Sequence, residues 1–288
     1  MFGIKFNALK ILNIEQFNEK LNIQPVTKER LADRFGEPAM SDSTKEFIKR
    51  NKLEWNKYTR KYNAEGDVSI TDDDLIDGRF PVEFDIVKGK FDCSHCKTLV
   101  SVEGSPTRVF GDYICECCDI LTTMKGAPKY VRGFYCDTNP SLEHLECRDT
   151  KVYGDFACSK SSVKSLEDCP QIIKGNFDCG YTNIESLKGV PINIGGHFNC
   201  EYCKQLKSLE HAPVYVFGYF RCEGCTNLVS LKGAPKHVSV SFNCKGCENV
   251  TEIGCEIEEI KKGFYYKGCT KLKSFKGLPK NVQKYKDA

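Results

Sequence analysis

The stretch Phe91-Asp92-Cys93-Ser94-His95-Cys96 places an aromatic residue, a cysteine two positions later and a second cysteine three positions after that. The same phrase returns along the chain at steps of 21 or 22 residues. The positions equivalent to Cys93 are Cys115, Cys136, Cys158, Cys179, Cys200, Cys222, Cys244 and, at the end, Tyr266. Self-similarity at a fixed period of 20–50 residues is the signature of a solenoid. The sequence therefore predicts a stack of short, similar turns.

Within one repeat, the aromatic residue and the cysteine are two positions apart, so they lie on one face of a short strand. Three residues after that cysteine, a second column holds small residues that can form hydrogen bonds. Its members are Cys96, Cys118, Asn139, Ser161, Thr182, Cys203, Cys225, Cys247 and Cys269. We expect this column to satisfy backbone groups at the turn that leaves the strand. Leucine pairs, a Gly-Ala-Pro turn and a Val or Ile then complete the repeat.

The phrases SLKGVPINIGGHFNC (186–200) and SLKGAPKHVSVSFNC (230–244) carry a family resemblance. They resemble leucine-rich repeats of the treponemal class and, more closely, leucine-rich-like repeat proteins encoded by tailed bacteriophages. The resemblance covers residues 66–288. It implies an α+β repeat fold, a leucine-rich-repeat-like solenoid of about nine to ten repeats of 21–22 residues. Short parallel strands would line one face, and turn-rich returns would form the other.

Two parts are expected in the chain: a helical N-terminal cap over 1–63 and the solenoid over 64–288. In the first part we predict short helices within 13–21 and 27–35. A longer helix is predicted from Thr44 to Tyr62, begun by a capping box of Ser43 and Glu46. Its apolar stripe would be Ile48, Trp55, Tyr58 and Tyr62. Residues 66–86 resemble a degenerate first repeat, with Val68 and Ile70 as the aromatic and cysteine positions and Asp73 in the turn column.

Composition narrows the function classes. The net charge is +3, and the sequence lacks the clustered basic residues that are typical of a nucleic-acid-binding protein. Nucleic acid is therefore not an expected partner. No run of 18 apolar residues is present, and the N-terminus lacks a signal-peptide pattern. We therefore expect a cytoplasmic protein without a membrane partner. The phage resemblance makes the host cytoplasm or the virion the implied locations.

The eighteen cysteines invite a metal interpretation. Five C-x-x-C pairs occur, and pairs in consecutive repeats would lie roughly 5 Å apart, so a zinc site is geometrically conceivable. Asn139, Ser161 and Thr182 occupy the same column, however, and cannot all serve as zinc ligands. We expect buried, reduced thiols and no cofactor, with zinc as the alternative.

The sequence contains no Walker loop, dinucleotide-binding fingerprint, H-E-x-x-H or G-x-S-x-G motif, so we predict a non-enzymatic scaffold for protein–protein interaction. Its candidate binding face is the exposed side of the strands, where acidic residues recur and two tyrosines add aromatic anchors. The candidate residues are Asp92, Asp112, Glu116, Tyr135, Asp137, Asp155, Asp178, Glu201, Tyr219 and Glu223. Over the first seven repeats, where Lys90 and Arg221 are the opposing bases, this face favours a protein partner with a basic surface; in the last two repeats Lys245 and Lys267 reverse the sign. The alternatives are a structural component of the virion and a cysteine-rich zinc-binding or redox-sensitive module.

Overall fold

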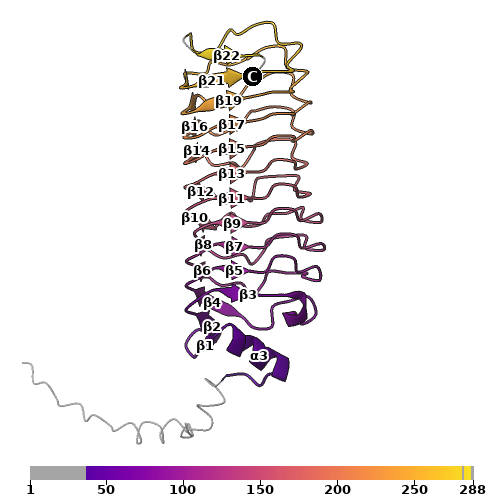
Figure 1. Cartoon of the computed structure of the whole chain (residues 1–288), viewed down its shortest axis with the longest axis vertical. Helices are drawn as coiled ribbons and strands as arrows, with labels where there is room; N and C mark the ends of the chain where they lie inside the picture. Colours follow the sequence, from indigo (N-terminus) through magenta and orange to yellow (C-terminus); the bar gives the residue numbers. More distant parts are fainter. Residues whose placement is uncertain (1–36, 281, 287–288) are drawn as a thin grey trace, which may run out of the picture. The chain divides into compact units, whose positions relative to one another are not determined.

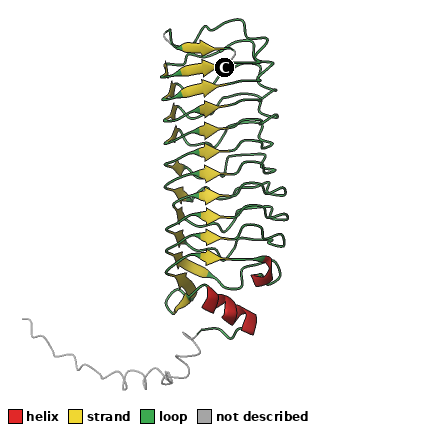
Figure 2. Ribbon diagram, viewed as in Figure 1, coloured by secondary structure: helices red, strands yellow, loops and turns green. Residues whose placement is uncertain are grey.

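The computed structural model describes residues 37–280 and 282–286, so the helices predicted within 13–35 lie outside the described residues. Residues 40–56 and 61–288 form one compact unit. In this unit the chain winds into a parallel β-solenoid of about ten turns, with one short α-helix near its N-terminal end (Figures 1 and 2). The predicted solenoid fold is therefore confirmed.

One sheet contains a strand from every turn and is called here the front sheet. Its strands pair in parallel without a register shift, so that Phe91 lies beside Tyr113 and Phe156 beside Phe177. Its eleven members are β3 (Val68–Ser69), β5 (Phe91–Asp92), β7 (Tyr113–Ile114), β9 (Phe134–Tyr135), β11 (Phe156–Ala157), β13 (Phe177–Asp178), β15 (Phe198–Asn199), β17 (Phe220–Arg221), β19 (Ser241–Asn243), β21 (Gly263–Tyr265) and β22 (Gln283–Tyr285).

The returns also form strands, which the sequence had indicated only as turn-rich connections. Apart from the antiparallel hairpin of β1 and β2, these strands pair in parallel, and together they are called the return sheet. A seven-stranded part contains β1 (Leu53–Asn56), β2 (Lys61–Ala64), β4 (Phe84–Val87), β6 (Arg108–Val109), β8 (Tyr130–Val131), β10 (Lys151–Val152) and β12 (Ile172–Ile173). A four-stranded part contains β14 (Asn193–Ile194), β16 (Tyr215–Val216), β18 (His237–Val238) and β20 (Glu259–Ile260). The Val or Ile that closes each repeat is the buried residue of these strands.

The core between the two sheets is a continuous column of aromatic rings. From Phe91 to Phe264, ring centroids in successive turns lie 4.9–5.5 Å apart, and each ring is fully buried. The strand cysteines and the leucine pairs fill the space beside this column. Each ring is therefore covered by the turns above and below it, as expected for a solenoid.

The predicted helix from Thr44 to Tyr62 is wrong beyond its first two turns. Helix α3 spans Asp42–Arg50, and its N-cap is Ser41, which accepts a hydrogen bond from the amide of Thr44. Asn51 is the C-cap of the helix: its Nδ2 donates to the carbonyl of Phe47, and its Oδ1 accepts from the amide of Ser69, which ties this end of the helix to β3. Within the described residues, no helix is long and apolar enough to cross a membrane.

The apolar stripe assigned to that helix belongs mainly to a hairpin. β1 and β2 pair antiparallel, which sets Trp55 beside Tyr62 with ring centroids 5.1 Å apart. β2 then pairs in parallel with β4, so the hairpin joins the first turn of the solenoid. The four residues of the stripe are spaced by 7, 3 and 4 positions, which fits a helix. This spacing does not reveal that the helix is broken at Lys52, which has a positive φ of 50°.

The first repeat follows the sequence prediction except at its turn. Val68 lies beside Phe91 in the sheet, and Ile70 is buried. Asp73, which was assigned to the buried turn column, is exposed within the short 3₁₀ helix η1 (Asp72–Asp74). Asp72 instead meets the next turn, where it accepts hydrogen bonds from the amides of residues 97 and 98. A carboxylate is too costly to bury in the apolar column, so it lies at the rim.

The ring column predicts a large cost for truncation in the middle of the stack. Phe177→Ala removes a ring that lies 5.2 Å from the rings of both neighbouring turns, and we expect it to lower the free energy of unfolding by about 3–5 kcal/mol. Chemical denaturation measures this change. Phe217→Ala, at an exposed position, is the control and should change stability by less than about 0.5 kcal/mol. Equal effects of the two substitutions would contradict the core assignment.

The candidate partner-binding face

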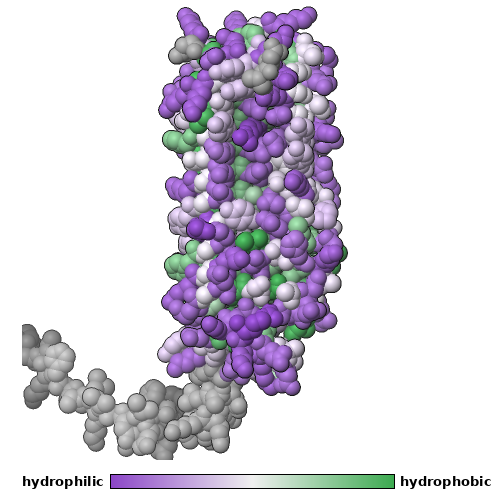
Figure 3. Space-filling model, in the orientation of Figure 1, coloured by the Kyte–Doolittle hydropathy of each residue, from purple (hydrophilic) through white to green (hydrophobic). Residues whose placement is uncertain are grey.

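The ten predicted site residues all lie on the outer side of the front sheet, in three columns. One column directly precedes the buried aromatic residue, one follows it, and one lies three residues after it. All ten side chains are partly exposed rather than fully in water. The structure therefore brings them onto one face, which is mostly hydrophilic in Figure 3. It also gives several of them structural contacts that the sequence did not reveal.

The column before the aromatic residue forms a ladder of hydrogen-bond acceptors. Asp155 Oδ1 accepts from the amide of Asn176 at 2.7 Å, and Asn176 Oδ1 accepts from the amide of His197 at 2.7 Å. His197 Nδ1 continues the ladder by accepting from the amide of Tyr219 at 2.9 Å. These side chains satisfy amides that the strands leave unpaired. Asp155 is thus part of the scaffold as well as of the candidate site.

This ladder explains why a glycine often occupies the position directly before the ladder residue in a repeat. A Cβ atom built on Gly196 would collide with Asn176 Oδ1, and one on Gly218 would collide with His197 Nδ1. The close approach of the side chain in one turn to the backbone of the next therefore requires glycine.

Three other acids stabilise the bend where the front strand ends. Asp92 and Asp178 each accept a hydrogen bond from the amide two residues later, the pattern of an Asx turn. Asp137 accepts from the amide and hydroxyl of Ser159 in the next turn, at 2.6 and 2.7 Å. These bonds fix the direction of each carboxylate.

Most carboxylates of this face have no cationic partner. Asp112 forms a two-pronged contact with Arg132, and Asp92 lies 3.3 Å from Lys90 Nζ. Among the residues that the structure describes, no ion pair involves the other six: Glu116, Asp137, Asp155, Asp178, Glu201 and Glu223. Their charges therefore give the first seven repeats of the front sheet a negative field, which Lys90 and Arg221 oppose and which Lys245 and Lys267 reverse in the last two repeats.

The crowding of acids also affects protonation. Burial raises the pKa of Asp137 to about 6, against the opposing effect of the Ser159 hydrogen bonds. Burial, followed by the neighbouring Asp92, raises the pKa of Glu116. The central part of the face therefore becomes fully negative only above the ordinary titration range of carboxylates.

An aromatic pair beside this face was not part of the sequence prediction. Tyr181 and Tyr202 stack with centroids 4.7 Å apart, and Tyr202 Oη lies 3.5 Å from Glu223 Oε1. Both occupy the residue of positive φ that follows the strand in each turn. The recurrence of tyrosine at equivalent positions in two adjacent repeats was the available signal.

The thiols are used inside the solenoid as small hydrogen-bond donors. In the turn column, Cys225 Sγ donates to the carbonyl of Cys200 at 3.1 Å, and Cys247 Sγ repeats this contact with Cys222. Asn139 Nδ2 makes the equivalent bond to the carbonyl of Cys115 at 2.7 Å. The column therefore has the turn-satisfying role that the sequence predicted.

All eighteen cysteines are free thiols, and only Cys117 and Cys255 are partly exposed. Burial raises the pKa of Cys136 and Cys158 well above the ordinary value, which keeps these thiols protonated. In the described part of the chain, no group of three or more His, Cys, Asp or Glu side chains is arranged to hold a metal ion. A zinc site would have to replace the thiol hydrogen bonds just described.

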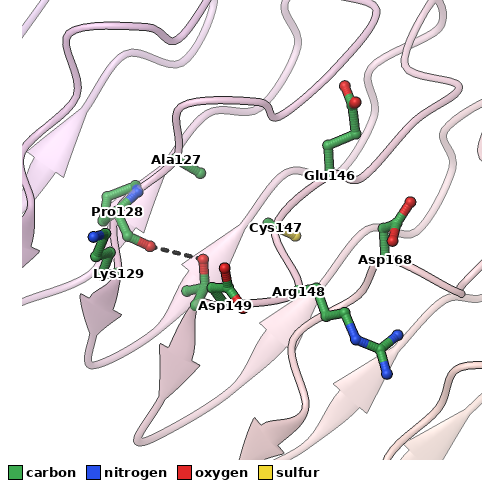
Figure 4. Close-up of a pocket in the computed structure, with 9 residues that line it drawn as sticks. Ala127, Pro128, Lys129, Glu146, Cys147, Arg148, Asp149 and Asp168 are labelled. Atoms are coloured by element: carbon green, nitrogen blue, oxygen red, sulfur yellow. Dashed lines mark hydrogen bonds between the residues drawn. The ribbon is translucent and has the colours of Figure 1, made fainter.

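A pocket of about 350 Å³ lies where one repeat lacks the Gly-Ala-Pro turn (Figure 4). Thr150 Oγ1 donates to the carbonyl of Pro128 at its rim, at 2.7 Å. The side chains of Glu146, Arg148 and Asp168 point in different directions rather than toward one point (Figure 4). Catalysis needs groups that converge on a reacting atom, so this pocket is a gap between turns rather than a candidate active site.

The raised pKa of Asp137 predicts a pH-dependent stability. The folded-state pKa of about 6 exceeds the ordinary value of 3.8, so folding favours the neutral acid. The stability that this preference provides is present below pH 4 and is lost as the pH rises through 6. Asp137→Asn keeps an oxygen acceptor for Ser159 without ionising, and should raise the free energy of unfolding at pH 7 by about 1–3 kcal/mol. Denaturation at pH 4 should show no such gain; a pH-independent difference would contradict this assignment.

Comparisons with models of protein families, with curated proteins and with solved structures found no match for this chain. The likeness to phage leucine-rich-like repeats therefore stays a prediction from sequence motifs.

Proposed function

We propose that the protein is a non-enzymatic scaffold that uses the outer side of the front sheet to bind a protein with a basic surface. The observation that carries this proposal is the set of six acidic residues without cationic partners on one face of a slightly basic protein. Several acids elsewhere do pair with lysines of consecutive turns, as in Lys188–Glu167 and Lys232–Glu210, although others, such as Glu248 and Glu256, form no ion pair among the described residues. Charges of one sign that lack counter-charges create a field that accelerates association and selects partners of opposite charge.

The hydrogen bonds of the face suit it to binding. Asp137, Asp155 and Asp178 are held by backbone amides or by Ser159, so little side-chain entropy remains to be lost on association. Tyr135 and Tyr219 lie among them as partly buried aromatic residues of the type enriched at binding hot spots. A rigid, periodic, acidic surface would thus recognise a basic partner along its length.

The motif resemblance suggests the setting for this activity. A phage-encoded protein of this kind would act in the cytoplasm of the infected bacterium, on a host or defence protein. A structural role in the virion is the second candidate, and the number of copies per purified particle distinguishes the two. A zinc-binding or redox-sensitive module is a third, which metal analysis of the purified protein tests.

Charge reversal tests the binding face without breaking the ladder. Glu116→Lys with Glu201→Lys changes two acids whose carboxylates make no described hydrogen bond, whereas substitution of Asp155 or Asp178 would also disturb folding. The double variant should bind the partner captured from infected cells with an association rate at least about 10-fold lower and a weaker salt dependence.

The matched control is Glu248→Lys with Glu256→Lys, which makes the same charge change at exposed positions outside the ten candidate residues. It should leave both rate and salt dependence close to those of the wild type. Unchanged association of the Glu116 and Glu201 variant, with folding verified by circular dichroism, would exclude this face as the binding site.

A further inference from the structure

The outer side of the return sheet carries a second pattern. In the return-sheet strands β6, β8, β10 and β12 the second of the two residues is buried. The residues directly before and after it therefore point outward. Before the buried residue these neighbours are Arg108, Tyr130, Lys151 and Ile172, and after it they are Phe110, Arg132, Tyr153 and Lys174. Each of four successive turns thus presents one cation and one apolar residue, aromatic in three of them. The order of the two alternates from turn to turn.

Parallel pairing brings the cations onto the rings. Arg108 and Lys151 both lie beside Tyr130 in the sheet. Arg108 Cζ is 4.8 Å from the Tyr130 ring centroid and 5.7 Å from that of Phe110, and Lys151 Nζ is 5.2 Å from Tyr130. The positive groups therefore lie close to the aromatic surface instead of extending into water.

The rings of this strip remain open to solvent. Phe110 is 55% exposed and Tyr153 58% exposed, and a shallow pocket of about 320 Å³ lies between their strands. Farther along the return sheet, Tyr215 and Phe217 are also exposed and line a second hollow. The fold does not require large apolar side chains at outward positions, so their recurrence on one sheet marks an interaction surface.

Three of the four cations of this strip also lack an ion-pair partner within the described residues. Arg132 is neutralised by Asp112, but among the residues described by the structure Arg108, Lys151 and Lys174 form no ion pair. The strip is therefore positive, while the front sheet of the same turns is negative.

We propose that the outer side of the return sheet, from Arg108 to Lys174, binds single-stranded nucleic acid. Exposed rings stack with bases irrespective of their identity, and adjacent cations neutralise phosphates, which together form the usual platform for single strands. An acidic peptide would use the cations but would leave the rings without a matching partner. Turns about 4.8 Å apart repeat this arrangement along the solenoid axis. This binding site is independent of the proposed protein-binding face.

Net charge alone does not reveal this strip. The total of +3 sums the acids of the front sheet with the cations of the return sheet, and it led to the expectation that nucleic acid is not a partner. Folding separates the two signs onto different faces. The negative front sheet would repel phosphates and so confine a bound strand to the return sheet.

The test uses the full chain and a fluorescein-labelled 20-nucleotide oligo-dT, with binding followed by fluorescence anisotropy between 50 and 200 mM salt. The wild type should bind with a linear dependence of log K on log salt. Arg108→Gln, Lys151→Gln and Lys174→Gln together should reduce the slope by about 2, since each neutralised phosphate contributes about 0.7. Phe110→Ala with Tyr153→Ala should weaken binding at least about 10-fold, with a smaller change in slope.

Two controls separate this site from general charge effects. Lys125→Gln, Lys204→Gln and Lys273→Gln remove the same charge at exposed positions outside the strip and should leave the slope nearly unchanged. Tyr181→Ala removes an exposed aromatic residue beside the front sheet and should leave the affinity unchanged. Equal losses in the strip and control variants would overturn the proposal.

Two further outcomes would also overturn it. One is the absence of oligo-dT binding at 50 mM salt by protein whose fold is verified by circular dichroism. The other is competition by polyglutamate of equal charge as effective as that of unlabelled oligo-dT, which would assign the strip to an acidic protein segment instead.

Discussion

The constraint on which the whole structure depends is the in-register stacking of one aromatic ring per turn. A ring such as Phe177 has no core of its own and is buried only because Phe156 and Phe198 lie 5.2 Å away on either side. This spacing is close to the distance between hydrogen-bonded strands, so ring contact and backbone pairing favour the same register. A slip by one residue would turn every ring toward solvent.

The same register sets the chemistry of the surface. Because consecutive turns superimpose, a side chain of one turn meets the backbone of the next at a constant position. Asp155, Asn176 and His197 use this proximity to satisfy amides, and a glycine in the following turn leaves the space for each of them. Acids that would be plain surface charges on another fold thus have a structural role in addition to the recognition role proposed for them. Substitutions on this face must be chosen with both roles in mind.

Stacking also sorts charge and aromatic character into longitudinal strips. The front sheet gathers carboxylates without cationic partners, and the return sheet gathers rings with cations lying over them. Between them, lysines and glutamates of consecutive turns neutralise one another, as in Lys207–Glu185. The solenoid thus presents two surfaces of opposite charge along one axis. The two partners proposed above would therefore bind without competing for the same residues.

The sequence by itself determined the period, the strand beginning at each aromatic residue, the burial of the cysteines and the role of the turn column. These features repeat in nearly every turn, so the agreement between the prediction and the structure does not rest on a single position. It also identified the ten outward residues of the front sheet, because alternation along a strand is a local property. The end of helix α3 at Asn51 could not be predicted from the sequence, because Asn51 accepts a hydrogen bond from the amide of Ser69, which lies in a later strand.

Only the tertiary structure decided which outward residues become neighbours. Arg108, Tyr130 and Lys151 are 22 and 21 residues apart in sequence, and they form one cation–aromatic cluster because parallel pairing aligns their strands. In most turns of the front sheet an aromatic residue and a cysteine two positions apart recur and mark the alternation, whereas each return strand from β6 onward has a single recurring buried Val or Ile, which did not identify a strand. The partial burial of Asp137 likewise comes from the adjacent turns. Local pattern fixes which way a side chain points, whereas contacts between turns fix what it meets.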